Sequence, residues 1–454
     1  MKTISNIFDK SSCKAILTLA WPLILSTCSN VIQQFVDKIF LAQYSQEALA
    51  AVMPAGMLVG AVVCFFTGTV GYVSNFIAQY RGAHSKHEIP VMINQALIVS
   101  LVFGLVVALF SLFPEFIFVT VAKHDLSLAY LETEYFKPMI YCAFLPICMS
   151  SIAGFFVGIE KSHVILWVSV VCTVFNIIFD YIFIFGKFGV PEMGVAGAAW
   201  ATQIATALAC VIFFVLYYSK YYHNEYNTRI KWKIRYDLIK KLFYYGVPSG
   251  IQITMDLLIW TMFILLIGRM SVVELAATNI AFQVDSIAFM PILGIGTAVS
   301  ILVANELGKE DKKSLGATIK NALLISAVID FVVLILFLTI PKILIRPFIN
   351  TAEPDLELIQ ISVNLLRICS IYIFVDGFGI ILASVLRGAG DTLFIMWTMF
   401  ICGIFIIVLP AYYATVIHNV YFGWFGCLTY LFVICFIFYL RVKAGKWKKI
   451  KIIA

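Results

Sequence analysis

Charged side chains are scarce in this sequence. Asp, Glu, Lys and Arg together make up 13% of the 454 residues, whereas apolar residues make up 62%. Soluble globular domains carry about 25% charged residues. The composition therefore excludes an ordinary soluble domain, and it indicates an integral membrane protein whose main partner is the lipid bilayer.

The sequence also lacks the short motifs of common catalytic and metal-binding sites. It has no phosphate-binding glycine loop, no nucleophile elbow and no His-Glu-x-x-His helix. Its 11 cysteines are scattered singly without a Cys-x-x-Cys pair, so neither a disulfide framework nor a zinc site is indicated. We therefore expect no enzyme activity and no cofactor. Without a Walker motif, the energy for any transport has to come from an ion gradient or from another protein.

Twelve long apolar segments are present instead. A membrane-spanning helix needs about 20 such residues, and the apolar runs are continuous rather than alternating, which excludes a β-barrel. The first segment lacks a cleavage site, so we expect it to be retained as a helix. The predicted fold is an all-α integral membrane protein with twelve transmembrane helices, near residues 15–42, 49–80, 91–118, 135–158, 163–185, 194–219, 243–268, 276–307, 320–341, 361–386, 394–416 and 423–442.

The most polar stretch lies between the sixth and seventh segments. Residues 220–241 hold seven basic residues against two acids. Lys and Arg gather on the cytoplasmic side of membrane proteins. If the N-terminus is inside, 24 of the 32 Lys and Arg residues fall in cytoplasmic segments, from Lys2 to Lys451. This asymmetry explains the net charge of +7 without a nucleic-acid partner. It predicts a multi-pass protein of the inner (plasma) membrane with both termini in the cytoplasm.

The two halves of the sequence repeat. With an offset of 226, Pro22 aligns with Pro248 and Gly68 with Gly294. Six spans separate the copies, an even number, so both halves have the same orientation and form parallel repeats about an axis along the membrane normal. We expect two lobes with a cleft between them for alternating access. The predicted parts are an N-terminal lobe at 1–219, a basic cytoplasmic linker at 220–241 and a C-terminal lobe at 242–454.

Six aspartates lie at membrane depth. Each would cost roughly 2.5–3.5 kcal/mol at the centre of a membrane helix. A chain that carries several is expected to use them to bind a cation, relay a proton or recognise a charged solute. They are Asp37, Asp180, Asp256, Asp285, Asp330 and Asp376.

One group of polar residues lies in the N-terminal half. Asn176 and Asp180 are four apart and share one face of the fifth span. If that face looks toward Asp37 on the first span, two carboxylates and a carboxamide converge, and Thr202 on the sixth span adds a hydroxyl. Such oxygens suit a hard cation such as sodium, or a proton shared between the acids. Hydrogen bonding between helices without an ion is the alternative. Lys38 points about 100° away from Asp37 and can snorkel outward.

A second group lies in the C-terminal half. Asp256 is on the seventh span, and Tyr372 and Asp376 are four apart on the tenth. They are candidates for binding a cation or a cationic substrate, with a hydrogen-bonded core acid as the alternative. Asp285 and Asp330 are each isolated from a second acid in their own span and are weaker candidates. Four glutamines are further candidates to line the cleft, although packing between helices explains them equally well: Gln33, Gln34, Gln252 and Gln283.

Five stretches are specific in combination: "LAWPLILSTCSNVIQQFVDKIFLAQYSQEALAAV" near the start, "FNIIFDYIFIFGKFGVPEMGVAGAAWAT" in spans five and six, "GVPSGIQITMD" and "GIGTAVSILVANELG" in spans seven and eight, and "LRGAGDT" after span ten. With them the chain resembles, over nearly its whole length, the multidrug and toxic compound extrusion (MATE) family in its NorM-like and DinF-like bacterial forms.

The resemblance implies two six-helix lobes and cation-coupled export, driven by sodium or protons, of small amphiphilic and mostly cationic compounds. We expect a monomer. The residues that match the family's N-lobe cation site are Asp37, Asn176, Asp180 and Thr202, and those that match the C-lobe acids of the NorM-like branch are Asp256, Tyr372 and Asp376. Asp256 is one methylene shorter than the glutamate typical of that branch.

Two other kinds of transporter stay open on the sequence. One is an exporter dedicated to a single endogenous metabolite. The other is a flippase for lipid-linked saccharides, which should have a strongly basic cavity for pyrophosphate, whereas Arg367 is almost alone among the intramembrane arginines. A membrane-embedded enzyme would need a catalytic motif, and the sequence has none.

Overall fold

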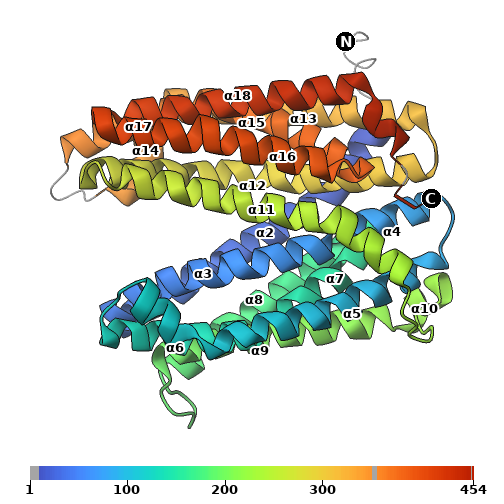
Figure 1. The fold of residues 1–454 in the computed structure, drawn as a ribbon, viewed down its shortest axis with the longest axis horizontal. Coiled ribbons are helices and arrows are strands. Elements are labelled where there is room, and N and C mark those ends of the chain that lie inside the picture. The colour runs from blue at the N-terminus through green and yellow to red at the C-terminus, as the bar shows by residue number, and fades with distance from the viewer. Residues whose placement is uncertain (1–9, 350–354, 451, 454) are drawn as a thin grey trace. The chain divides into compact units, whose positions relative to one another are not determined.

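The computed structural model describes residues 10–349, 355–450 and 452–453, and across these residues it is helical with short turns and no strand. Lys2 and Lys451, which were counted among the basic residues of the predicted cytoplasmic segments, lie outside the described residues. The helices of the first half (Figure 1) are α2 (Lys10–Tyr44), α3 (Gln46–Gly71), α4 (Val73–Gly82), α5 (Glu88–Ala108), η1 (Leu109–Leu112), η2 (Phe116–Val121), α6 (Leu126–Tyr141), α7 (Phe144–Gly158), α8 (Ser162–Ile184), α9 (Gly194–Tyr217) and α10 (Lys220–Tyr226).

The second half is also helical. Its elements (Figure 1) are α11 (Tyr236–Ile267), α12 (Val272–Gly308), α13 (Lys312–Thr339), α14 (Pro341–Ile345), η3 (Arg346–Phe348), α15 (Leu356–Ala389), α16 (Thr392–Cys402), η4 (Gly403–Val408), α17 (Leu409–Ile417), α18 (Val420–Ala444) and η5 (Lys446–Lys449).

The described residues contain 11 helices that are long and apolar enough to cross a membrane, and a twelfth span if the bent pair α6 and α7 is counted as one. The two members of that pair meet at 42°. The break follows Pro138 and precedes Pro146. Proline lacks the backbone N–H and clashes with the preceding turn, so the span bends there. The predicted all-α membrane fold with twelve spans is confirmed.

The chain forms two compact units whose boundaries fall inside helices. One unit is Leu25–Thr254, and the other is Met1–Ile24 together with Met255–Ala454. The first turns of α2 therefore pack with the helices of the second half, and the first half of α11 packs with those of the first half. These boundaries differ from the lobe boundaries expected from the spacing of the apolar segments, because two helices are each divided between the units.

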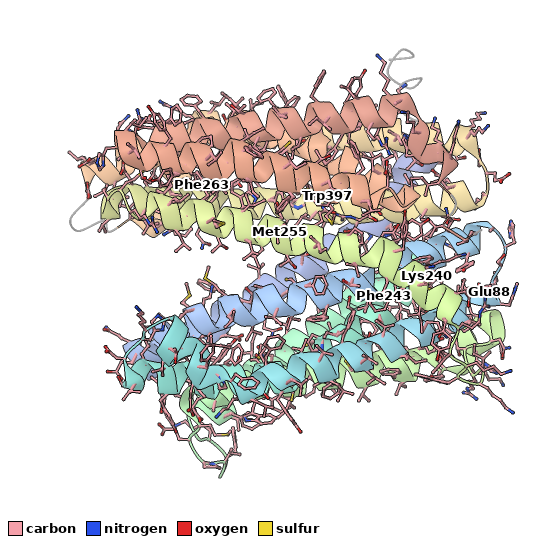
Figure 2. The ribbon with its side chains drawn as sticks, viewed as in Figure 1. Glu88, Lys240, Phe243, Met255, Phe263 and Trp397 are labelled. Atoms are coloured by element: carbon pink, nitrogen blue, oxygen red, sulfur yellow. The ribbon has the colours of Figure 1, made fainter. Side chains whose placement is uncertain are left out.

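Aromatic contacts along α11 follow this division. Phe243 lies near the start of α11 (Figure 2). Its ring meets that of Phe103 of α5 edge to face, with ring centroids 5.6 Å apart. Phe263 lies further along the same helix (Figure 2). Its ring meets that of Trp424 of α18, with ring centroids 5.8 Å apart. Such pairs stabilise packing beyond the area that they bury. Each half of α11 thus has its own set of neighbours.

Two glycines at equivalent positions of the repeat each allow a neighbouring helix to approach closely. Gly294 of α12 lies against Ala20 and Ile24 of α2. Gly68 of α3, the matching position in the first half, lies against Gly250 of α11. Ile24 and Gly250 also match each other in the repeat, so the two contacts are copies of one another. Helix backbones approach this closely where small residues leave room. The repeat in the sequence therefore corresponds to a repeated packing contact.

The repeat also preserves a helix cap. Ser45 accepts a hydrogen bond from Ala48 N (2.9 Å) at the start of α3, and Ser271 accepts one from Glu274 N (3.2 Å) at the start of α12. The two serines occupy matching positions of the repeat, and both have extended backbone. A serine at this position satisfies a backbone N–H that has no partner within the helix.

The linker before α11 is fixed to the unit of residues 25–254. The buried Gln95 of α5 donates Nε2–H to Lys233 O (3.0 Å) and accepts at Oε1 from Arg235 N (2.9 Å). Arg235 also forms ion pairs with Glu88 (3.1 Å) and Asp237 (2.6 Å). These contacts hold the backbone immediately before α11, and so they set where that helix begins.

An ion pair outside the spans holds the start of the linker. Lys86 lies 3.1 Å from Glu225 of α10. Burial raises the pKa of Glu225, but hydrogen bonds from Lys86 and Tyr226 outweigh this effect and lower the pKa below its usual value. Glu225 is therefore ionised at neutral pH, and its contribution to stability is lost only as the pH falls through this lowered pKa.

Alanine at either packing glycine should destabilise the protein by about 1–3 kcal/mol, because the added methyl overpacks the contact. A Cβ at position 294 would overlap Ile24, and one at position 68 would lie 3.0 Å from the Cα of Gly250. Thermal unfolding of purified Gly68→Ala and Gly294→Ala measures this loss. Gly60→Ala is the matched control, since a Cβ there meets nothing within 4 Å. Variants as stable as the control would contradict the packing described.

Candidate functional site

Three helices bring the four predicted N-terminal residues together. Asp37 lies on α2, Asn176 and Asp180 lie one turn apart on α8, and Thr202 lies on α9. Asn176 and Asp180 are fully buried. All four belong to the unit of residues 25–254. The i, i+4 spacing on α8 places its two side chains on the same face, as the sequence predicted.

Hydroxyl groups tie α2 to α8 along the turns that precede the site. Ser26 Oγ lies 2.7 Å from Ser169 Oγ, and Ser29 donates to Thr173 Oγ1 at 2.9 Å. Hydrogen bonds between small polar residues are a common way to hold membrane helices in register. This pairing fixes the depth at which Asp37 meets α8.

The Asn176 amide bridges the site. In the orientation that satisfies its partners, Nδ2–H donates to Asp37 Oδ1 (2.9 Å) and to Asp180 Oδ2 (3.2 Å), and Oδ1 accepts from Thr202 Oγ1 (3.3 Å). With the amide turned over, Nδ2–H donates to Thr202 Oγ1 (3.3 Å) instead. The two orientations follow from the hydrogen-bond network, which is the usual basis for assigning an amide. Both keep Asn176 between the acids and the threonine.

The Asp37 and Asp180 carboxyls lie within hydrogen-bonding range of each other. Two carboxyl groups can bond directly only when one of them carries a proton, because an ionised carboxylate accepts but does not donate. Asp180 Oδ1 has no other hydrogen-bond partner among the described residues. The neighbouring Lys38 is exposed and acts on Asp37 only weakly, through its charge. The pair therefore suits a shared proton or another single positive charge.

A tyrosine that the sequence analysis missed completes this site. Tyr135 of α6 interacts electrostatically with both Asp37 and Asp180. Its ring also lies close to Gly56 of α3, where an added Cβ would be 3.8 Å from Cε1. In the sequence, Tyr135 lies in a mixed polar segment and cannot be told from a tyrosine at the membrane surface, so no signal pointed to it.

The C-terminal acids gather around Asp376 of α15. Asp376 interacts electrostatically with Asp285 of α12, with Asp256 of α11 and with Asp330 of α13. All four lie in the unit that contains Met255–Ala454. Asp256 accepts a hydrogen bond from the indole of Trp260 and interacts electrostatically with Arg387. Four neighbouring helices thus contribute one acid each.

Tyr372 has a different partner from the one that its spacing suggested. Its hydroxyl lies beside the carboxyl of Asp285, not beside Asp376. The ring stacks on Trp424 of α18 at 6.2 Å and 24°. Asp285, the weaker candidate in the sequence, therefore joins the site through Tyr372. The spacing of Tyr372 and Asp376 placed them on one helix face but carried no information about α12.

The four glutamines occupy different environments. Gln252 is buried with no hydrogen-bond partner for Oε1 in the described chain, Gln33 is half-buried, and Gln34 and Gln283 are exposed. Their role in lining a cleft stays a prediction. Across the described residues, no group of three or more His, Cys, Asp or Glu side chains is arranged to hold a metal ion.

Comparison with known proteins agrees with this architecture. The sequence model of the MatE family matches residues 22–182 and again residues 248–413, and the two matches begin at equivalent positions of the repeat. The probable multidrug resistance protein NorM of Bradyrhizobium diazoefficiens is 26% identical over 382 residues, covering 83% of this chain and 81% of that protein. The protein of the same name from Listeria innocua is 25% identical over 444 residues, covering 96% and 95%.

A solved structure has the same fold. It is the outward-facing conformation of a multidrug resistance MATE family transporter of the MOP superfamily. The match has a TM-score of 0.87 at 19% identity, and it covers 96% of this chain and 97% of the other. At this identity the match supports the fold of the chain and nothing beyond the fold.

Replacing Asn176 should cost more stability than replacing Thr202. Asn176→Leu removes the donors of two carboxyl groups, for an expected loss of about 1–3 kcal/mol, whereas Thr202→Val removes one hydroxyl and should cost about 0.5–1.5 kcal/mol. Thermal unfolding of the two purified variants at one pH compares them. A larger loss for Thr202→Val would contradict the bridging role of Asn176.

Proposed function

Because the chain belongs to the MatE family of transporters, we propose that it exports small amphiphilic, mostly cationic compounds in exchange for sodium ions or protons, by alternating access. The relatives named as multidrug resistance proteins support drug export. The observation that carries the proposed coupling is the Asp37–Asp180 carboxyl pair bridged by Asn176. We further propose a monomer in the inner (plasma) membrane with both termini and the linker in the cytoplasm.

The N-terminal site couples transport to an ion through its charge. Two ionised carboxyls at hydrogen-bonding distance repel each other, and burial makes this arrangement more unfavourable. One positive charge, from a proton or a sodium ion, relieves the repulsion. The site therefore alternates between a loaded and an empty state of different energy, and this difference can drive a change of conformation.

The orientation of the Asn176 amide would differ between a bound proton and a bound sodium ion. With Nδ2–H directed at Asp37 and Asp180, the site offers donors to the acids, which suits a proton shared between them. With the amide turned over, Nδ2–H donates to Thr202 and the amide oxygen faces the acids. Three oxygen-bearing side chains then surround one point, which suits a hard cation such as sodium. The coupling ion would thus set the orientation of the amide.

The acids of the C-terminal unit suit a lipophilic cation. Asp376 interacts electrostatically with both Asp256 and Asp285. Tyr372 lies beside Asp285, and its ring stacks on Trp424. Carboxylates in a low-dielectric site attract positive charge strongly, and aromatic faces add cation–π attraction. Apolar walls discriminate shape weakly, so selectivity would rest on charge. We expect cationic dyes such as ethidium to be exported and neutral or anionic solutes to be moved poorly.

Efflux from cells tests this function. Cells that express the wild type should expel ethidium and tolerate it better than cells without the protein. Asp37→Asn should return efflux to the level of cells without the protein, because the substitution keeps shape and removes the charge that the coupling ion binds. Asp256→Asn should lose resistance to cationic compounds in particular. Asp125→Asn is the matched control, since Asp125 is exposed and its side chain caps no backbone N–H.

Near-normal efflux by Asp37→Asn would exclude the coupling role of that residue. A wild type that confers no resistance to any such cation, together with accumulation of one defined metabolite when the protein is deleted, would favour a dedicated exporter. Immunoblots of membrane fractions would check that each variant is inserted at the level of the wild type.

A further inference from the structure

Asp330 is a buried acid that the proposed ion and substrate sites do not use. It lies on α13, well before the end of that helix at Thr339. At 1.5 Å per residue it is about 13 Å from the helix end, well inside the span. Its side chain is 0% exposed. Asp330 is therefore a carboxyl at membrane depth that is shielded from solvent in this conformation.

The carboxyl of Asp330 has one hydrogen-bond donor. Ser326 Oγ, one turn earlier on α13, donates to Asp330 Oδ2 at 2.8 Å. Asp330 Oδ1 has no partner among the described residues. No Lys, Arg or His of the described chain offers it a compensating charge. An ionised carboxylate in this setting would be strongly unfavourable, because one hydroxyl replaces the whole hydration shell.

The backbone of α15 forms the other wall of this pocket. A Cβ at Gly377 would overlap the Asp330 carboxyl, so the carboxyl is seated directly on the glycine Cα. The fit is specific to this position. At Gly379, two positions further on, a Cβ would find ordinary contact with Cys435 at 3.7 Å. The glycine at 377 therefore makes room for the carboxyl of Asp330 in particular.

We propose that Asp330 is a proton-binding site of the C-terminal unit, in which a neutral carboxyl is held by Ser326 and seated on Gly377. A proton fits this pocket better than a metal ion. Hard metal ions take six or more oxygen ligands, whereas the Ser326 hydroxyl is the one polar group that contacts the carboxyl in the described chain.

The site is coupled to the neighbouring acids. Asp330 interacts electrostatically with Asp376 on α15, which in turn interacts with Asp285 on α12 and Asp256 on α11. The helices packed against α13 are α15, α12 and α14. Lys342 of α14 does not act on Asp330. A lipophilic cation bound beside Asp376 adds positive charge near Asp330 and favours release of its proton to the surrounding solution. Departure of the cation favours its return.

This coupling rests on the proposed function and extends it. Binding of the substrate cation would release the proton by electrostatic repulsion between the two sites. The cation and the proton would not compete for the same oxygen atoms. Linkage is reciprocal, so protonation of Asp330 would weaken binding of the cation by the same factor.

Infrared difference spectroscopy of the full-length protein in lipid nanodiscs tests the site. The spectrum of the wild type minus that of Asp330→Asn, at pH 7 without sodium, should contain the carbonyl band of one protonated carboxylic acid. Carboxylate bands in that difference spectrum would overturn the proposal. Ser326→Ala should keep the protonated band and move it to higher frequency, because the carbonyl loses its hydrogen bond. If Asp330→Asn does not fold, the spectrum of the wild type minus that of Ser326→Ala gives the same test, because the band of the protonated Asp330 moves between the two.

The glycines provide a matched pair. Gly377→Ala should shift or remove the band, and Gly379→Ala should leave it unchanged. Equal spectra for Gly377→Ala and Gly379→Ala would contradict the contact between the Asp330 carboxyl and Gly377.

Addition of ethidium tests the coupling. Ethidium should reduce the band in the wild type and leave it unchanged in Asp376→Asn. Binding of ethidium, followed by its fluorescence, without a change in the wild-type band would overturn the coupling. If ethidium does not bind at all, the proposed function fails, whereas the difference spectrum still decides whether Asp330 carries a proton.

Discussion

The interior of a bilayer does not solvate charge, and this constrains every acid that lies at membrane depth in this protein. A carboxylate at the centre of a span costs roughly 2.5–3.5 kcal/mol, whereas a hydrogen bond to a charged group contributes about 1.5–3 kcal/mol. At the middle of these ranges, the two bonds from Asn176 to Asp37 and Asp180 offset the cost of one ionised carboxylate but fall short of the cost of two. A single positive charge held between the two carboxyls would remove the remaining cost, and this is why we propose the pair as an ion-binding site.

The repeat gives each half of the chain one contact at which a glycine lets a helix approach closely. Gly68 and Gly294 occupy equivalent positions, and each admits a helix whose remaining part belongs to the other compact unit. α2 and α11 each have residues in both compact units. Asp37 and Asp256 lie on these two divided helices. The predicted coupling acid Asp37 and the predicted cation or substrate acid Asp256 are thus each on a helix that both units share.

Much of the fold and part of the site could be predicted from the sequence. The spans follow from long apolar runs, and the convergence of Asp37, Asn176, Asp180 and Thr202 follows from a four-residue spacing on one helix and from a family resemblance. Local spacing carried no information on how neighbouring helices are rotated or shifted along their axes. Tyr372 therefore meets Asp285 instead of Asp376, and the seat of Asp330 on Gly377 was not foreseen. The division of α2 and α11 was missed for the same reason, since it depends on packing and not on hydropathy.

Transport by the purified protein under one gradient at a time tests the central claim, that a single positive charge at the Asp37–Asp180 pair drives export. The protein is reconstituted in vesicles, a sodium gradient or a proton gradient is imposed separately, and ethidium movement is followed by fluorescence. We expect one of the two gradients to drive movement in the wild type and neither to drive it in Asp37→Asn. Gradient-driven movement of equal rate in Asp37→Asn, or a wild type that binds ethidium but responds to neither gradient, would contradict the account.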